Sequence, residues 1–123
     1  MKKIILVQDY QVDRHLLKKI EQCTGSACSL MPLDYFYPHL VLENPPALIV
    51  FDISGASSEW VWRLEQLKNL SEDQGTQCPS VIVVSSSPTK DLERLVRAAR
   101  VDFFLPRTFV DDSIDVALKQ ALQ

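Results

Sequence analysis

The sequence predicts an α/β domain in which five parallel strands form one doubly wound sheet. Short, continuously apolar segments recur five times within 123 residues, a pattern typical of strands that helices cover on both faces. Each segment is followed by apolar residues at helical spacing. Several segments also end at a charged or hydroxyl side chain. Ligands of open parallel sheets bind beyond the carboxyl ends of the strands, so a site is expected at that edge.

The sequence signals for the five predicted strands differ in strength. Residues 47–52 give the clearest signal, because they follow a Pro-Pro break and stay apolar up to Asp52. The first apolar segment is as regular and ends beside Asp9, whereas the second is short and mixed. The predicted strands are residues 3–7, 28–33, 47–52, 81–84 and 103–105. Right-handed crossovers and the commonest arrangement of such sheets predict the strand order 2-1-3-4-5.

Amphipathic spacing predicts five helices, one after each strand. In the second helix, Pro38 must lie at or near the first turn. In the fourth, Ser87 is the expected cap, Pro88 the first helical residue, and Leu95 part of the buried face. The polar residues 71–79 predict a loop after the third helix. The predicted helices are residues 12–21, 35–43, 59–67, 88–99 and 111–122.

Length and composition predict one domain over residues 1–123 with a sizeable core, since 46% of the residues are apolar. The formal net charge of −3 argues against a nucleic-acid-binding surface, which needs clustered positive charge. No apolar stretch approaches the length of a membrane span, so we expect a cytoplasmic protein. Cys23, Cys28 and Cys78 are odd in number and lack a C-x-x-C spacing, which favours reduced thiols.

The predicted topology brings four reactive side chains to one edge. The first and third strands become neighbours, so Asp9 and Asp52 lie side by side, and Ser85 and Arg107 end the next two strands. Two carboxylates form a hard oxygen site suited to Mg²⁺. Asp52 is also a candidate nucleophile for a phosphoryl group, whose oxygens a hydroxyl and a cation would hold.

Four motifs in this order resemble the receiver domains of bacterial two-component response regulators, and the resemblance covers essentially the whole chain. The segments that carry it are residues 4–9, 46–52, 79–85 and 103–109. It implies a flavodoxin-like fold and a bound Mg²⁺. It assigns the phosphoryl acceptor to Asp52, metal ligation to Asp9, Asp52 and the Ser54 carbonyl, a water-mediated metal contact to Gln8, and phosphoryl-binding or switch roles to Ser85, Phe104 and Arg107.

The resemblance also implies how such a domain works. It is not itself an enzyme, and it receives its phosphoryl group from a histidine kinase or phosphotransfer protein. It then signals through a downstream output protein, and the surface formed by the fourth helix, fifth strand and fifth helix is a candidate homodimer interface. The chain would be a stand-alone receiver or one excised from a larger regulator. A membrane or a nucleic acid is not an expected partner.

Departures from the family pattern leave a second function open. Gln8 stands where an acidic residue is usual, which should weaken Mg²⁺ binding. Arg107 replaces a lysine, and its planar fork can pair with a carboxylate at two points. Residues 53–58 lack the usual loop motif. The alternative is therefore a pseudo-receiver, a protein-interaction module that is not phosphorylated.

Simpler explanations exist for three of the candidate residues. Asp9 can cap the helix that follows it. Ser85 can satisfy nearby backbone groups, because three consecutive serines also make an ordinary loop start. Phe104 can be a packed aromatic side chain. A flavin- or nucleotide-binding enzyme of the same fold is disfavoured, because no glycine lies in a Gly-rich turn between a strand and a helix.

Overall fold

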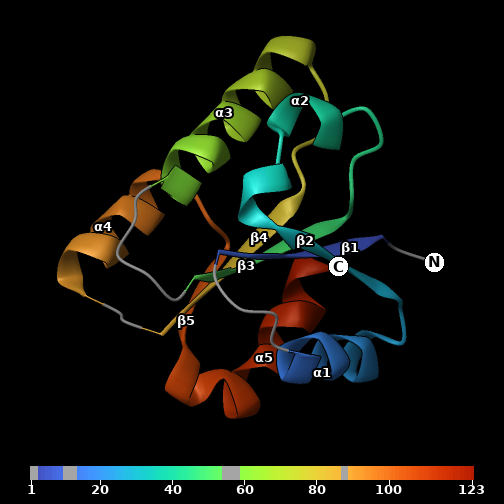
Figure 1. Ribbon diagram of the computed structural model, residues 1–123, viewed down its shortest axis with the longest axis vertical. Coiled ribbons are helices and arrows are strands. Elements are labelled where there is room, and N and C mark those ends of the chain that lie inside the picture. The colour runs from blue at the N-terminus through green and yellow to red at the C-terminus, as the bar shows by residue number, and fades with distance from the viewer. Residues whose placement is uncertain (1–2, 10–13, 54–58, 87–88) are drawn as a thin grey trace.

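The centre of the molecule is a parallel sheet with the strand order β2-β1-β3-β4-β5, which confirms the predicted topology (Figure 1). The computed structural model describes residues 3–9, 14–53, 59–86 and 89–123, apart from the side chain of Phe109. The strands are β1 (Ile4–Gln8), β2 (Cys28–Pro32), β3 (Leu48–Ile53), β4 (Ser80–Ser85) and β5 (Phe103–Pro106).

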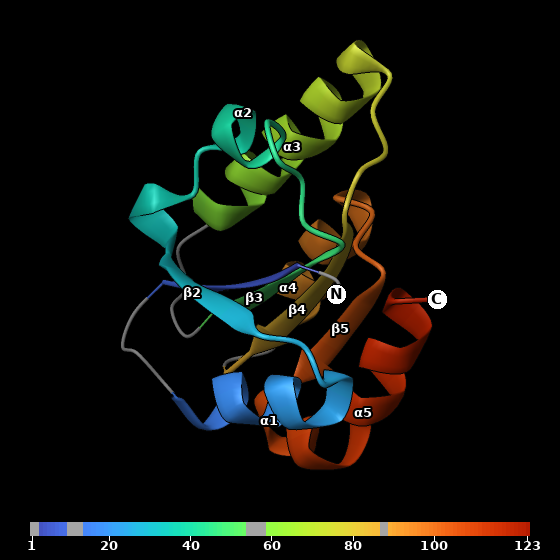
Figure 2. The ribbon, with the colours of Figure 1, turned by 90° about the vertical axis from the view of Figure 1, so that its right-hand side faces the viewer.

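Helices cover both faces of the sheet, with α1 and α5 on one side and α2, α3 and α4 on the other (Figures 1 and 2). The helices are α1 (Arg14–Thr24), α2 (Pro38–Val41), α3 (Glu59–Gln74), α4 (Lys90–Ala98) and α5 (Val110–Ala121), and the short 3-10 turns are η1 (Leu33–Tyr35) and η2 (Arg107–Phe109).

Alternation along the strands divides the core into two layers. In β3, Phe51 packs under the face of α2, α3 and α4, whereas Val50 packs under α1 and α5. Both are fully buried, as the continuous apolar run predicts for a strand that is covered on both sides. Asp52 therefore belongs to a strand that is buried over its whole length and ends at the sheet edge.

Two helices differ from the prediction. α3 continues to Gln74, through part of the predicted loop, because Ser71 turns its hydroxyl inward and donates a hydrogen bond to the Thr76 carbonyl at 2.7 Å. That bond satisfies a polar side chain on the buried face. α2 is shorter than expected, although Pro38 occupies its first turn as predicted. The residues before it form the 3-10 turn η1.

The start of α4 also differs from the prediction. The helix begins at Lys90 and is capped by Thr89, whose Oγ1 accepts a hydrogen bond from the Leu92 amide at 3.1 Å. Ser87 and Pro88, the predicted cap and first residue, lie outside the described residues. Leu95 is 44% exposed rather than buried, because Val96 takes the central position of the inner face.

The Thr89 cap makes a measurable contribution to stability. Replacing Thr89 with Ala removes the acceptor for a backbone amide in the first turn and should lower the free energy of unfolding by about 1 kcal/mol. Urea unfolding followed by circular dichroism measures the change. The Thr89→Ser variant keeps a hydroxyl and should retain most of the stability. Equal losses in the two variants would contradict the capping role.

Cys28 should be the least reactive of the three cysteines. Burial of its thiol, and secondly the nearby Glu21 carboxylate, raise the pKa of Cys28 to about 12. At pH 8 such a thiol is ionised in about one molecule in ten thousand, and only the thiolate reacts with iodoacetamide. Cys23 and Cys78 are partly exposed and should be alkylated first, as peptide mass spectrometry would show. Alkylation of Cys28 at the same rate in the folded protein would refute this expectation.

Candidate functional site

The carboxyl ends of β1, β3, β4 and β5 form the edge at which the predicted residues lie. Strand register places Gln8 directly opposite Asp52. Ser85 lies opposite Ile53 on one side and Pro106 on the other. The prediction that these strand ends meet is confirmed, and it follows from the parallel topology alone.

Asp52 lies at the centre of this edge and is only 4% exposed. The side-chain amide of Gln8, itself 5% exposed, donates a hydrogen bond through Nε2 to Asp52 Oδ2 at 2.8 Å. A carboxylate only accepts hydrogen bonds, so the nitrogen of the amide, not its oxygen, faces Asp52. The two side chains come from neighbouring strands and point to the same face of the sheet.

Arg107 supplies the second contact to Asp52. It is the first residue of η2, directly after β5, and its Nη2 donates to Asp52 Oδ1 in an ion pair. Its Nε donates to Ser86 Oγ at 3.0 Å. The planar guanidinium thus joins the end of β3 to the segment after β4 through two different nitrogens, whereas a lysine would have to make both contacts from one. The Arg107 side chain remains 33% exposed.

The other predicted residues surround this network. Asp9 follows β1 and is partly exposed, and Ser85 is buried at the end of β4. Phe104 is partly buried and packs against the core layer beneath α2, α3 and α4. Ser54 lies outside the described residues. The roles assigned to these four residues stay predictions.

Ser86 is a contact residue, in the described part of the edge, that the sequence did not single out. Its hydroxyl binds the Arg107 guanidinium directly. The three consecutive serines at residues 85–87 predicted the start of a loop with several hydroxyl groups. Which of the three hydroxyls faces the cation depends on how the chain leaves β4, and that is not readable from the sequence.

The arrangement of Asp52 does not fit Mg²⁺, which needs oxygen ligands in octahedral geometry. Each Asp52 oxygen accepts a hydrogen bond from a nitrogen, and the Gln8 group that faces Asp52 is an N–H, which is not a metal ligand. Within the described residues, no cluster of three or more His, Cys, Asp or Glu side chains is arranged to hold a metal. Mg²⁺ binding stays a prediction, and the ion would compete with Arg107 for the Asp52 carboxylate.

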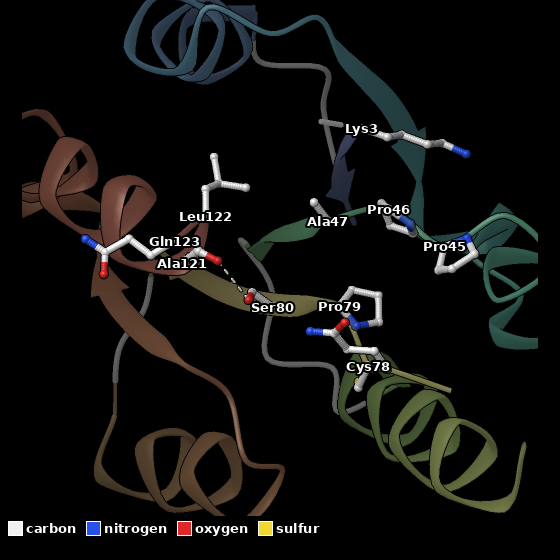
Figure 3. A pocket seen from close by; sticks show the side chains of 11 residues that line it. Lys3, Pro45, Pro46, Ala47, Cys78, Pro79, Ser80, Ala121, Leu122 and Gln123 are labelled. Carbon is white, nitrogen blue, oxygen red and sulfur yellow. Dashed lines mark hydrogen bonds between the residues drawn. The ribbon is translucent and has the colours of Figure 1, made fainter. Parts of the chain in front are cut away.

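A cavity of about 450 Å³ lies at the opposite edge of the sheet, where the strands begin (Figure 3). Ser80 lines it and donates a hydrogen bond to the Ala121 carbonyl at 2.9 Å. Lys3, which also lines it, donates to the Asn44 carbonyl at 3.2 Å. These polar groups bind the protein itself, and the cavity is separated from Asp52 by the length of the strands. It is not part of the candidate site.

The described part of the chain contains no helix long and apolar enough to cross a membrane. The comparisons with known proteins add information at the level of the fold. No protein-family model matches the sequence, and no curated protein matches it either.

Solved structures of receiver domains are similar to this chain. A receiver domain of a two-component histidine kinase from Clostridium thermocellum has a TM-score of 0.75 at 16% identity, over 99% of this chain and 98% of that one. The receiver domain of the Arabidopsis thaliana histidine kinase CKI1, complexed with Mg²⁺ and BeF₃⁻, has a TM-score of 0.73 at 16% identity, over 98% and 89%. The receiver domain of NtrC4 from Aquifex aeolicus gives 0.73 at 20% identity, over 98% and 96%.

The chain therefore has the flavodoxin-like fold of the receiver domains found in response regulators and histidine kinases. The predicted resemblance is confirmed at this level. Because identities are this low, the likeness establishes the fold and not the chemistry of the edge. The function of the edge depends on its own contacts.

Proposed function

We propose that the chain is a pseudo-receiver of two-component signalling, a cytoplasmic and non-enzymatic module that acts by binding a partner protein. The observation that carries the proposal is the network at the sheet edge, in which Gln8 and Arg107 each bind one oxygen of Asp52. The expected partners are an output protein and, where the module still docks one, a histidine kinase or phosphotransfer protein.

The network disfavours phosphorylation for a physical reason. A carboxylate that attacks a phosphoryl group must approach it with a free oxygen lone pair, and charge on the phosphoryl oxygens must be neutralised as it builds. Here the nearest cation, Arg107, is already paired with the nucleophile itself. The charge-assisted hydrogen bond from Arg107 is roughly twice as strong as a neutral one, and it lowers the reactivity of the Asp52 oxygen that accepts it.

Exposed aromatic side chains are consistent with a module that works through protein contacts. Tyr35 in η1 and Trp62 in α3 are 67% and 58% exposed, and Tyr37 just before α2 and Leu40 within it are also exposed. Aromatic residues are enriched at protein interfaces. The homodimer through α4, β5 and α5 remains a separate prediction.

A phosphorylated receiver is the second candidate function. It is favoured by the placement of Asp9, Asp52 and Ser85 at one strand edge and by the fold's likeness to a receiver domain complexed with Mg²⁺ and BeF₃⁻. In that case Asp52 would be the acceptor, Mg²⁺ the required ion, and Ser85, Phe104 and Arg107 the residues that respond.

One experiment separates the two functions. The protein is incubated with acetyl phosphate and Mg²⁺, and its intact mass is measured before and after base treatment. We expect no phosphoryl group on the wild type, because Arg107 and Gln8 hold Asp52. An acid-stable, base-labile phosphoryl group that is absent from Asp52→Asn, but present in the exposed control Asp112→Asn, would establish the second function and overturn the first.

A further inference from the structure

The edge of the sheet holds a buried carboxylate that needs a positive charge near it. Asp52 is almost inaccessible to solvent, and an ionised carboxylate is costly to bury unless it is paired. Gln8 gives it a hydrogen bond but no charge. Arg107 gives it both.

Arg107 reaches this carboxylate from the rim and not from the core. A third of its side chain is exposed, although its guanidinium contacts a residue that is almost fully buried. Removing the side chain beyond Cβ should therefore open a channel from solvent to Asp52 instead of leaving a closed void. Asp52 Oδ1 and Ser86 Oγ, which now accept from Nη2 and Nε, would both be left without these donors.

We propose that the guanidinium of Arg107 is the resident cation of this edge, and that without it the edge becomes a binding site for an external cation. The inference rests on the contacts that underlie the proposed function and deepens it. The buried Asp52 carboxylate needs a positive charge beside it, and in the natural protein the Arg107 side chain supplies that charge. A soluble guanidinium ion should suit the vacated position best, because its fork can bind Asp52 and Ser86 together. Mg²⁺ supplies charge without that fork.

Thermal unfolding of the full chain tests this proposal. Arg107→Ala is melted in ethylguanidinium chloride, in ethylammonium chloride and in MgCl₂, each at equal ionic strength against NaCl. A ligand that binds the folded state stabilises it, whereas guanidinium salts also act as general denaturants, so each shift is taken relative to the wild type in the same salt. On that basis ethylguanidinium should raise the Tm of Arg107→Ala by about 5 °C. Mg²⁺ should raise it by a smaller amount, and ethylammonium by the least.

Two controls assign the effect to Asp52. The double variant Arg107→Ala/Asp52→Asn lacks the carboxylate charge and should lose the response to all three cations. Arg94→Ala removes an exposed arginine from α4, at a distance from the edge residues in sequence, and should respond like the wild type, without a specific shift. If Arg107→Ala does not fold alone, its refolding yield in each salt is the measurement, and Arg107→Gln is melted in its place.

The outcomes are distinct. A folded Arg107→Ala that shows no shift in any of the salts, or a shift that persists in the Asp52→Asn double variant, overturns the inference. A saturable Mg²⁺ stabilisation of the wild type that Asp52→Asn abolishes would instead count against the proposed function, because Arg107 would then not close the edge. The first result concerns Arg107→Ala and the double variant, whereas the second concerns the wild type and Asp52→Asn with Arg107 in place, so the two failures can be told apart.

Discussion

Arg107→Ala is expected to lower the free energy of unfolding by about 3 kcal/mol, because it leaves a buried carboxylate without its counter-charge. The Asp52 side chain is 4% exposed, and water that enters along the vacated Arg107 position would solvate the carboxylate without replacing the lost charge. The loss should fall short of the largest values for buried ion pairs, since Arg107 itself is partly solvated. Urea unfolding monitored by circular dichroism gives the number.

Substitution of the other partner of the ion pair should lower the free energy of unfolding by less. Asp52→Asn keeps the shape of the side chain and leaves the charge on Arg107, which already contacts solvent, so we expect a loss of about 1 kcal/mol. In the double variant the two losses should not add, because both remove the same pair. Arg94→Ala, an exposed arginine, serves as the control and should change stability by less than about 0.5 kcal/mol. A loss for Arg107→Ala no larger than that of the control would show that the ion pair contributes nothing.

The topology of the chain was predictable because it depends on signals that repeat along the sequence. Apolar runs identified the strands, and helical periodicity between them required parallel connections, which fixed the neighbours of β3. Once the strand order is known, the location of Asp52 follows from the end of its strand. A candidate site could thus be located with no knowledge of any side-chain contact.

The state of that site was not predictable in the same way. The sequence indicated that Arg107 could pair with a carboxylate, but whether its guanidinium reaches Asp52 depends on distances of a few ångströms. The water-mediated metal contact assigned to Gln8 stays a prediction, whereas the hydrogen bond from its amide to Asp52 was not foreseen. Such contacts are decided by side-chain conformations at the edge, and no periodic signal in the sequence reports them.

The errors in the predicted helix boundaries have a similar origin. Ser71 reads as a loop residue, because an isolated serine carries no sign that its hydroxyl will be satisfied by the Thr76 carbonyl. Thr89 was overlooked as a cap because Ser87 and Pro88 gave the stronger local pattern. In both cases a polar side chain forms a hydrogen bond with a backbone group a few residues away. Helix propensity alone does not predict whether such a bond forms.

Phe51→Ala is expected to have the largest effect on stability, a loss of about 4 kcal/mol. Phe51 is fully buried and packs edge-on against Phe36, with ring centroids 5.2 Å apart, and against Trp60 at 6.1 Å. Truncation would leave a cavity between β3 and the α2–α3 face that these large rings cannot fill. Phe51→Leu retains most of the volume and should lose only about 1.5 kcal/mol, measured by the same urea titration.

Phe51 also tests whether the core and the edge are independent. It is adjacent to Asp52 in β3, but the two side chains point to opposite faces of the sheet. Phe51→Leu should therefore leave the coupling between Asp52 and Arg107 unchanged, when that coupling is measured by a double-mutant cycle in either background. If the coupling instead falls by more than about 0.5 kcal/mol, the packing beneath α2 and α3 positions the Asp52 carboxylate, and the ion pair is a property of the whole sheet.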